Sequence, residues 1–246
     1  YSDNLIIGNA RHGSMIRGTE LFGDYSITNT LVSNSIIEIN AEDAETTRVS
    51  AVVTQGTTST ESNPTFYQDT ILSSNIANVR FGDNYGKGYN HHFYNVTFNK
   101  EGDNTNYHTF IFDGGYSRDG HIIRDPIFTN GARYDDVYWQ RTGDLSAYSI
   151  EWTLSITTKL GNTIDIYDIN NNLVYSGVTD ETAQISVPLK EVTIRPTEWT
   201  INSHGSGVRE KSSNQKIMHT PHRILINHQP TSEISITMNE TKAIKL

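Results

Sequence analysis

Two groups of titratable side chains in this sequence have the residue types that polysaccharide-cleaving enzymes need. Such enzymes use paired carboxylates, or a base such as His, Lys, Arg or Tyr beside a cation. One group is Asp135-Asp136 with Tyr134 and Tyr138, and the other is a glycine-flanked group of Asp113, Asp119 and His121. Because Gly and Asp are also typical of turns between strands, we assign no catalytic residue. The favoured interpretation is that the chain is not an enzyme.

An aromatic and imidazole concentration between residues 85 and 108 points to sugar binding instead. Aromatic rings stack on the faces of sugar rings, and such surfaces are often shallow. We expect a carbohydrate-contact surface formed by Tyr85, Tyr89, His91 and Tyr107. Adjacent residues on a strand point to opposite sides, so His91 and His92 cannot ligate one metal ion. No metal site and no cofactor are predicted.

Two further motifs match known sites only in form. Asp168, Asn170 and Asn172 occupy the first ligand positions of a calcium loop, but the Gly and the distal Glu are missing, so we predict a hairpin turn. Asn95 and Asn239 each begin an Asn-X-Thr glycosylation sequon. We expect Asn95 to point inward, which leaves Asn239 as the predicted glycosylation site.

Composition and charge exclude several kinds of partner. The formal net charge of −9 and the pI near 5.4 disfavour binding to nucleic acid, which requires clustered Lys and Arg. The absence of cysteine excludes disulfides and thiolate metal sites. No apolar run approaches the roughly 20 residues that a membrane span needs. Because the chain opens at Tyr1 without a signal-type segment, we interpret it as a processed or excised piece.

The same composition favours short strands over helices. Hydrophobic residues make up 35% of the chain and charged residues only 19%, so the polar remainder is rich in Ser, Thr, Asn and Gly. Few segments carry apolar residues at helical spacing. We therefore predict an all-β protein with almost no helix.

Two interleaved repeats organise the first part of the chain. In one, an Asn or Asp lies between two apolar residues, and these polar anchors are Asn29, Asp69, Asn95 and Asp125. In the other, a short alternating strand ends in a small or polar residue, at Gly18, Asn40, Gly82, Asp113 and Gln140. A period of about 20 to 30 residues with at least two strands is what a coil of a β-solenoid requires. We predict that the four Asn and Asp anchors stack at one corner, where left-handed backbone is tolerated.

The Ser- and Thr-rich stretch 41–64 shows no apolar period, and we predict that it is one loop inserted into a coil. With this pattern, and with Phe93-Tyr94-Asn95-Val96-Thr97-Phe98 in particular, residues 1–148 resemble the right-handed parallel β-helix of the pectin-lyase-like superfamily. The resemblance implies about five coils. It implies no single activity, because the superfamily includes lyases, polygalacturonases, tailspikes, adhesins and surface-layer proteins.

The spacing changes after Trp152. Alternating residues lead into the Asn-rich turn 168–172, and the last strands are predicted at 223–227, 234–238 and 241–246. The run from Ile164 to Leu189 resembles the carboxypeptidase-regulatory-like or Cna-B-type module, a transthyretin-like or Ig-like β-sandwich of extracellular proteins. We therefore expect a second domain at 149–246, and the resemblance implies a spacer, stalk or supporting role.

These observations favour an extracellular or cell-surface structural or adhesive protein. Because an uncapped solenoid end exposes unpaired backbone groups, we expect self-association by stacking into a filament or sheath, or continuation into neighbouring coils of a larger chain. The alternative is a polysaccharide lyase or hydrolase, or the noncatalytic carbohydrate-binding remnant of one. A third interpretation is a trimeric viral fibre or spike. The expected partners are copies of the chain and a polysaccharide.

Overall fold

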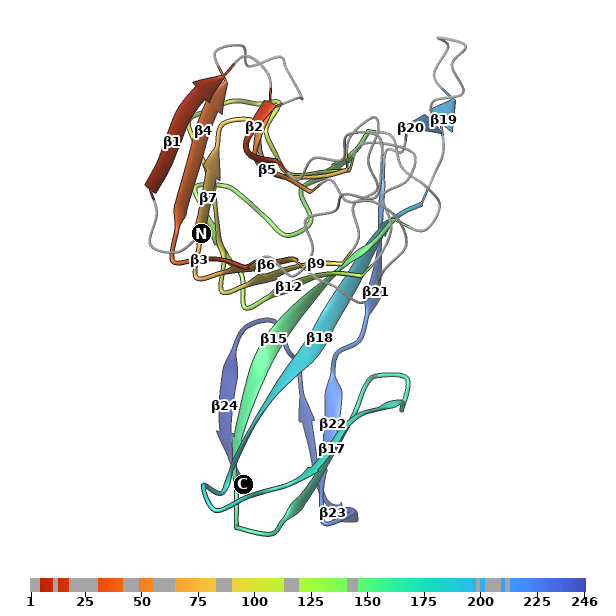
Figure 1. Ribbon diagram of the computed structural model, residues 1–246. Helices are drawn as coiled ribbons and strands as arrows, with labels where there is room; N and C mark the ends of the chain where they lie inside the picture. The colour runs from red at the N-terminus through yellow and green to blue at the C-terminus, as the bar shows by residue number, and fades with distance from the viewer. Residues whose placement is uncertain are drawn as a thin grey trace, which may run out of the picture. The chain divides into compact units, whose positions relative to one another are not determined.

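The computed structural model describes residues 5–10, 13–17, 31–41, 49–54, 65–82, 90–112, 120–140, 146–197, 200–201, 209–210 and 213–246. Within these ranges every regular element is a β-strand, which confirms the predicted all-β class (Figure 1). No helix long and apolar enough to cross a membrane occurs in this part of the chain. The chain divides into two compact units. Unit 1 comprises Tyr1–Tyr148 and Ile194–Gln215, and unit 2 comprises Ser149–Thr193 and Lys216–Leu246.

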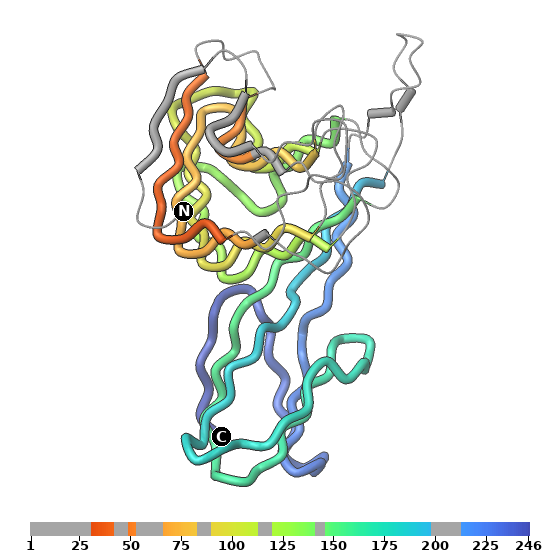
Figure 2. Tube along the Cα trace, viewed as in Figure 1, coloured from red at the N-terminus to blue at the C-terminus, as the bar shows by residue number. Residues whose placement is uncertain are grey.

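Unit 1 is built from three parallel sheets whose strands follow one another in turn along the chain. Sheet 1 contains β1 (Leu5–Ala10), β4 (Ile36–Ala41), β7 (Ile71–Ser74), β10 (Thr97–Lys100) and β13 (Ile127–Thr129). Sheet 2 contains β2 (Gly13–Arg17), β5 (Val49–Thr54), β8 (Ala77–Phe81), β11 (His108–Phe112) and β14 (Val137–Trp139). Sheet 3 contains β3 (Leu31–Ser33), β6 (Thr65–Gln68), β9 (His91–Tyr94) and β12 (His121–Arg124). Each coil contributes one strand to each sheet, so unit 1 is a β-helix of four to five coils (Figure 2).

The corner between sheets 3 and 1 carries the predicted ladder of Asn and Asp. Four residues in register have left-handed backbone: Asn34 (φ 47°), Asp69 (φ 49°), Asn95 (φ 52°) and Asp125 (φ 50°). The side-chain amide of Asn95 donates to Oδ1 of Asp69 on the preceding coil, at 2.6 Å. The stacking of Asp69, Asn95 and Asp125 is therefore confirmed. Asn and Asp suit this corner because their short polar side chains reduce the cost of positive φ.

The observed ladder differs from the predicted one in two details. Among the described residues its first member is Asn34, and the predicted first member, Asn29, lies outside them. Both have an apolar residue two positions before and three positions after, so the pattern alone does not distinguish them. Asn95 is exposed and does not point inward, because the residue after it, Val96, is the one that is buried.

The second predicted repeat mixed two sheets. Its strands ending at Gly82 and Gln140 correspond to β8 and β14 of sheet 2, but the strand ending at Asn40 is β4 of sheet 1. The missing strand of sheet 2 is β5, which lies inside the predicted loop 41–64 and pairs with β2 and β8. Val49, Ser50, Ala51 and Val52 are all buried, so β5 has no alternation of apolar and polar residues to reveal it.

The interior of unit 1 is filled by aromatic side chains that stack from coil to coil. Phe112 lies between Phe81 and Trp139, with ring centroids 4.6 Å and 4.4 Å apart. Tyr67 stacks on Phe93 at 4.8 Å, and Phe98 stacks on Phe128 at 5.3 Å. Since strands in a parallel ladder keep like residues in register, aromatic rings at equivalent positions meet face to face.

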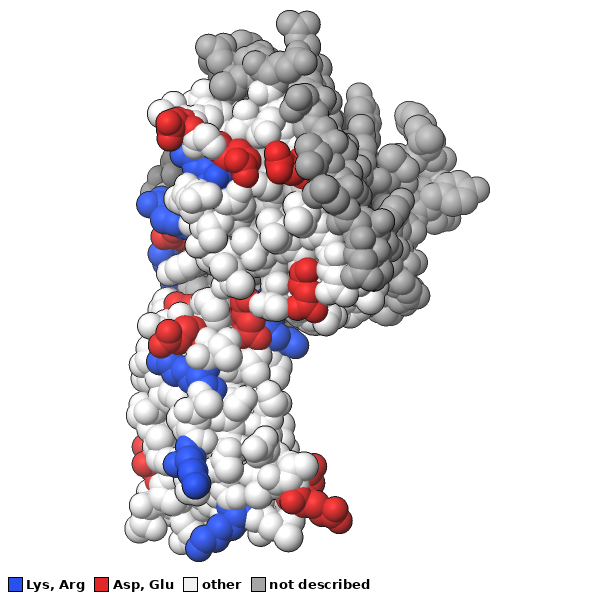
Figure 3. All heavy atoms as spheres, turned by 90° about the vertical axis from the view of Figure 1, so that its left-hand side faces the viewer, with Lys and Arg blue, Asp and Glu red and all other residues white. Residues whose placement is uncertain are grey.

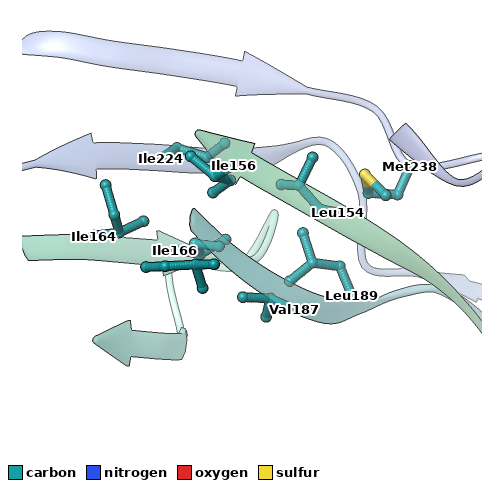
Figure 4. Packing of buried hydrophobic residues seen from close by; sticks show 9 residues of the cluster. Leu154, Ile156, Ile164, Ile166, Val187, Leu189, Ile224 and Met238 are labelled. Atoms are coloured by element: carbon teal, nitrogen blue, oxygen red, sulfur yellow. The ribbon is translucent and has the colours of Figure 1, made fainter. Parts of the chain in front are cut away.

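Unit 2 contains two sheets around one apolar core. An antiparallel sheet has the order β17-β16-β22-β23, and β15 lies between β18 and the parallel strand β24. The bounds are β15 (Tyr148–Thr157), β16 (Thr163–Tyr167), β17 (Leu173–Val178), β18 (Gln184–Pro196), β22 (His222–Ile226), β23 (Gln229–Ile236) and β24 (Lys242–Lys245). The core residues Leu154, Ile166, Leu189 and Ile224 come from both sheets (Figure 4). The strands predicted at 223–227 and 241–246 are confirmed as β22 and β24. Strand β23 overlaps the strand predicted at 234–238 only at residues 234–236, because it begins at Gln229 and ends at Ile236.

The segment 194–215 belongs to unit 1, although the sequence analysis placed it with the second domain. It contains the small antiparallel pair of β19 (Thr200–Ile201) and β20 (Arg209–Glu210) and the start of β21 (Asn214–Met218). Asn214 accepts a hydrogen bond from Nε1 of Trp139 at 2.6 Å and donates to the carbonyl of Asp135 at 2.9 Å. The returning chain therefore contacts the last coil of the β-helix.

Replacing Asn95 with Val will lower the free energy of unfolding of unit 1 by about 1–2 kcal/mol, because a β-branched residue is strained at positive φ. The substitution also removes the amide that donates to Asp69. Urea denaturation followed by circular dichroism measures the change. Asn95→Gly is the control, since glycine adopts this backbone without strain, and it is expected to be less destabilising than Asn95→Val. The opposite order would contradict the role of the corner.

Candidate functional site

The structure buries the two predicted sugar-binding residues that it describes. His91 is 4% exposed and Tyr107 is 5% exposed, while Tyr85 and Tyr89 lie outside the described residues. The Tyr107 hydroxyl donates to Oδ1 of Asn78, and burial raises the pKa of this phenol. Neither His91 nor Tyr107 presents a ring face that a sugar could stack on.

His91 forms part of a stacked pair inside unit 1. Its ring lies 5.6 Å from that of His121 at an interplanar angle of 13°, and its backbone N–H donates to Nδ1 of His121 at 3.3 Å. Neither ring nitrogen of His91 has a hydrogen-bond partner among the described residues. Burial, with a contribution from His92, lowers the pKa of His91 to about 3. Nearly parallel rings direct their lone pairs along parallel planes, so this pair does not converge on one metal ion.

The outer face of sheet 3 carries a different set of rings, which come from β6 and β9. Phe66, His92 and Tyr94 are all half-exposed, and their ring centroids are 5.2 to 5.7 Å apart. The guanidinium of Arg124 lies 4.3 Å from the centroid of the Tyr94 ring, within range of a cation–π interaction. We call Phe66, His92, Tyr94 and Arg124 the outer aromatic cluster.

Strand geometry explains why these four side chains meet. Along β9 the burial alternates, with His91 and Phe93 buried and His92 and Tyr94 half-exposed. The parallel register places Phe66 beside His92, and Tyr94 beside Arg124. Three coils therefore contribute to one continuous surface, and the predicted opposite orientation of His91 and His92 is confirmed.

Hydrogen bonds fix the protonation state of His92. The Oδ1 atom of Asn90, which can only accept, lies 2.8 Å from Nε2, so Nε2 carries the proton. Nδ1 then accepts from the Tyr94 hydroxyl at 2.9 Å. Burial and the nearby Arg124 lower the pKa of His92 to about 4. At neutral pH the imidazole is uncharged, and Arg124 supplies the positive charge of the cluster.

This arrangement has the chemistry of a sugar-contact surface. Half-exposed rings offer apolar faces to the C–H groups of a sugar, and a guanidinium donates to hydroxyl or carboxylate oxygens. On the face in Figure 3 the basic residues that are drawn are scattered among acidic ones and form no continuous basic patch. With a formal net charge of −9, the chain is a poorer match for a polyanion of high charge density, such as nucleic acid, than for a carbohydrate.

None of these four residues belongs to the predicted sugar-contact surface, because that prediction grouped aromatic residues by their distance along the chain. The alternation of inward and outward side chains along each strand would have identified them. Phe66, His92 and Tyr94 alternate with the buried Tyr67, His91 and Phe93, so they lie on the outer side of their strands. With the corner at Asp69 and Asn95 fixed, the residues one and three positions before each corner are the outer ones.

A second polar group consists of His108, Asp136 and Tyr138. Asp136 accepts at Oδ1 from Nδ1 of His108, 2.9 Å away, and at Oδ2 from the backbone N–H of Thr109 at 3.3 Å. Tyr138 stacks on His108, with ring centroids 5.3 Å apart at an angle of 19°. Asp135 instead lies 3.6 Å from the guanidinium of Arg133. The pair Asp135-Asp136 is thus divided between two partners and does not form a carboxylate pair.

The remaining residues singled out in the sequence lie in a turn, at an exposed position, in the core or outside the described residues. Asp168 accepts hydrogen bonds from the backbone N–H groups of Asn170 and Asn172, both at 2.8 Å, which confirms the predicted hairpin turn. Asn239 is exposed between β23 and β24, as its predicted modification requires. Asp113 and Asp119 lie outside the described residues, and His121 is buried. The described residues contain no group of three or more His, Cys, Asp and Glu suited to a metal ion.

The chain was compared with protein-family models, curated proteins and solved structures. No protein-family model, no curated protein and no solved structure matches the chain.

Acidification will destabilise unit 1 before its carboxylates protonate. Because the pKa of His91 is about 3 in the folded state and near 6.5 when unfolded, the unfolded chain binds the extra proton. The stabilisation by neutral His91 is complete above the unfolded pKa and falls as the pH decreases, by up to about 1.4 kcal/mol per pH unit. Urea denaturation at several pH values between about 7 and 5 measures this slope, and His91→Phe will reduce it. An unchanged slope in this variant would rule out the assignment.

Proposed function

We propose that this chain is an extracellular structural and adhesive protein that contacts glycans through the outer aromatic cluster. The observation that supports the proposal is the arrangement of Phe66, His92 and Tyr94 as half-exposed rings on adjoining coils, with Arg124 against Tyr94. A rigid parallel ladder holds the rings at fixed separations without a loop that has to close. Such a platform suits repeated contact with a polymer better than turnover of a small substrate.

The two units fit the same role. We infer that unit 1 is a β-helix of the pectin-lyase-like type and that unit 2 is a sandwich of the carboxypeptidase-regulatory-like or Cna-B type, which serves as a spacer or support. Both kinds of module occur in secreted and surface proteins. A chain without cysteine keeps its fold in either redox environment, so an extracellular location needs no disulfide. Stacking of β-helix ends into a filament or sheath is compatible with this role.

Loss of the Tyr94 ring will weaken glycan binding without unfolding the chain. Immobilised neutral and uronic-acid polysaccharides, probed with the purified chain, give the wild-type affinity. Tyr94→Ala is expected to reduce the affinity about tenfold, since a stacked aromatic contributes about 1–1.5 kcal/mol. Tyr167→Ala is the matched control, because Tyr167 is also a half-buried tyrosine under an arginine, Arg223, but belongs to unit 2. Equal losses in the two variants, or no binding by wild type to any polymer tested, would refute the proposal.

A second function, cleavage of an acidic polysaccharide, is favoured only by the His108–Asp136 pair. A carboxylate on Nδ1 orients the imidazole and leaves Nε2 to act as a general base toward a sugar C–H or a water. If the pair is catalytic, Asp136→Asn will abolish release of unsaturated product from uronic-acid polymers, measured by absorbance. Asp135→Asn, at the neighbouring position, is the control. Absence of product with wild type would leave Asp136 with its structural role beside Thr109.

A further inference from the structure

The outer aromatic cluster is part of a longer row of side chains on sheet 3. In each coil the residue three positions before the ladder residue at the corner faces outward, and the parallel register sets these residues side by side on β3, β6, β9 and β12 (Figure 1). We call them the outer row: Leu31, Phe66, His92 and Ile122. Leu31 is 48% exposed, and the other three are half-exposed. The surface therefore extends over four coils and not only over the three that form the cluster.

A second row of outward side chains runs beside the first. We call it the polar row, and it consists of the residue immediately before each ladder residue: Ser33, Gln68, Tyr94 and Arg124. Each of these side chains carries a hydroxyl, amide or guanidinium group. Gln68 is exposed, and the other three are half-exposed. Sheet 3 thus presents a row of alkyl and ring side chains next to a row of hydrogen-bonding groups.

A packed inner layer holds both rows in place. The residues between the two rows point inward and are at most 4% exposed: Val32, Tyr67, Phe93 and Ile123. Tyr67 stacks on Phe93 with ring centroids 4.8 Å apart and an interplanar angle of 8°. Because neighbouring strands lie about 4.8 Å apart, the outer row advances by this distance from coil to coil and spans about 14 Å. The backbone ladder therefore sets the spacing of the whole surface.

The long dimension of this surface lies along the axis of the β-helix. Each strand of sheet 3 contains only three or four residues, so it presents two outward side chains before the chain turns at the corner. Across the strands, the same two rows continue through four coils. A ligand that covers the surface must therefore be long and narrow and must cross the strands. A single sugar unit covers only part of the outer row, whereas a chain of linked units can contact every coil.

Backbone groups take no part in this surface. Strands β6 and β9 each have a neighbour on both sides, so their N–H and C=O groups are paired within sheet 3. An extended peptide therefore cannot add to them as a further strand. Binding must come from side chains, through apolar contact on the outer row and hydrogen bonds from the polar row. Sugars present both kinds of group, with C–H groups on the ring faces and hydroxyls at the ring edges.

The charges beside the two rows disfavour an acidic polymer. The corner next to the polar row carries the carboxylates of Asp69 and Asp125. Within the two rows the only charged side chain is Arg124. Two carboxylates and one guanidinium leave this edge with a net negative charge, in a chain whose formal net charge is −9. A polymer of uronic acids is repelled by such an edge, whereas a neutral polymer is not.

We propose that the ligand is a neutral, linear polysaccharide that lies along the β-helix axis, with successive sugar units on successive coils. The inference rests on the proposed function and adds to it the class of the polymer and its direction. The faces of the sugar units contact the outer row, and their hydroxyls bond to the polar row. Leu31 thereby becomes part of the binding site, although it lies two coils before Tyr94.

Calorimetric titration of the full chain with cello-, manno- and xylo-oligosaccharides, from disaccharide to hexasaccharide, tests this arrangement. Affinity for the series that binds is expected to rise with length up to about four units, one for each coil of the outer row, and then to level off. Affinity that does not change with length would overturn the proposal. If Tyr94→Ala still abolished that binding, the proposed function would remain. Absence of binding by every neutral and acidic glycan would remove both.

A variant at the end of the outer row gives a second measurement. Leu31→Ala is expected to weaken hexasaccharide binding about fivefold and to leave disaccharide binding unchanged, because only the longer chain reaches this coil. Ile36→Ala is the matched control, since Ile36 belongs to the same coil and is 38% exposed but lies beyond the corner on sheet 1. Equal losses in the two variants, or an equal loss for short and long chains, would contradict the proposed direction of the polymer.

The charge of the ligand is tested with polygalacturonate. It is expected to bind more weakly than the neutral probes, and binding of the neutral probes is expected to be nearly independent of salt concentration, since no ion pair forms. Tighter binding of polygalacturonate that weakens as salt is added would overturn the assignment of a neutral polymer. The same result would leave the proposed function in place, because a glycan would still be bound.

Discussion

The in-register stacking of parallel strands is the constraint on which unit 1 depends. Each coil contacts only the coils before and after it, so a residue is placed by the position of its equivalent one coil away. The aromatic column of Phe81, Phe112 and Trp139 and the exterior surface of Phe66, His92 and Tyr94 both arise from this repetition. The same rule that packs the inside therefore builds a patterned outside, and only the parity of a residue in its strand decides which surface it joins.

Histidine illustrates how strongly parity controls chemistry here. His91 and His92 are neighbours in the chain, and burial lowers the pKa of both. Their rings nevertheless have different contacts. His91 stacks on His121 within the interior and has no hydrogen-bond partner for either ring nitrogen among the described residues. His92 has both ring nitrogens bonded, to Asn90 and Tyr94, and borders solvent. The first acts as an aromatic packing residue, and the second orients the Tyr94 ring of the outer aromatic cluster.

Much of the architecture could be predicted from the sequence because a repeated corner leaves a repeated signature. Asp69, Asn95 and Asp125 were found since positive φ selects Asn and Asp at the same point of each coil. Strand β5 could not be found, because every residue from Val49 to Val52 is buried and no period remains. The outer aromatic cluster was missed for a related reason. Its members are separated by whole coils in the sequence, and their proximity becomes visible only when the register between coils is known.

The corner at Asn34, Asp69, Asn95 and Asp125 has one more consequence, for how this molecule can diversify. Two residues join sheet 3 to sheet 1 in every described coil, whereas the connections from sheet 2 to sheet 3 differ in length from coil to coil. Because this corner has a constant length, it restores the register between the strands of neighbouring coils once per coil. Insertions elsewhere in a coil are therefore absorbed before the next corner, and new surface loops can be gained or lost without displacing the strands that follow.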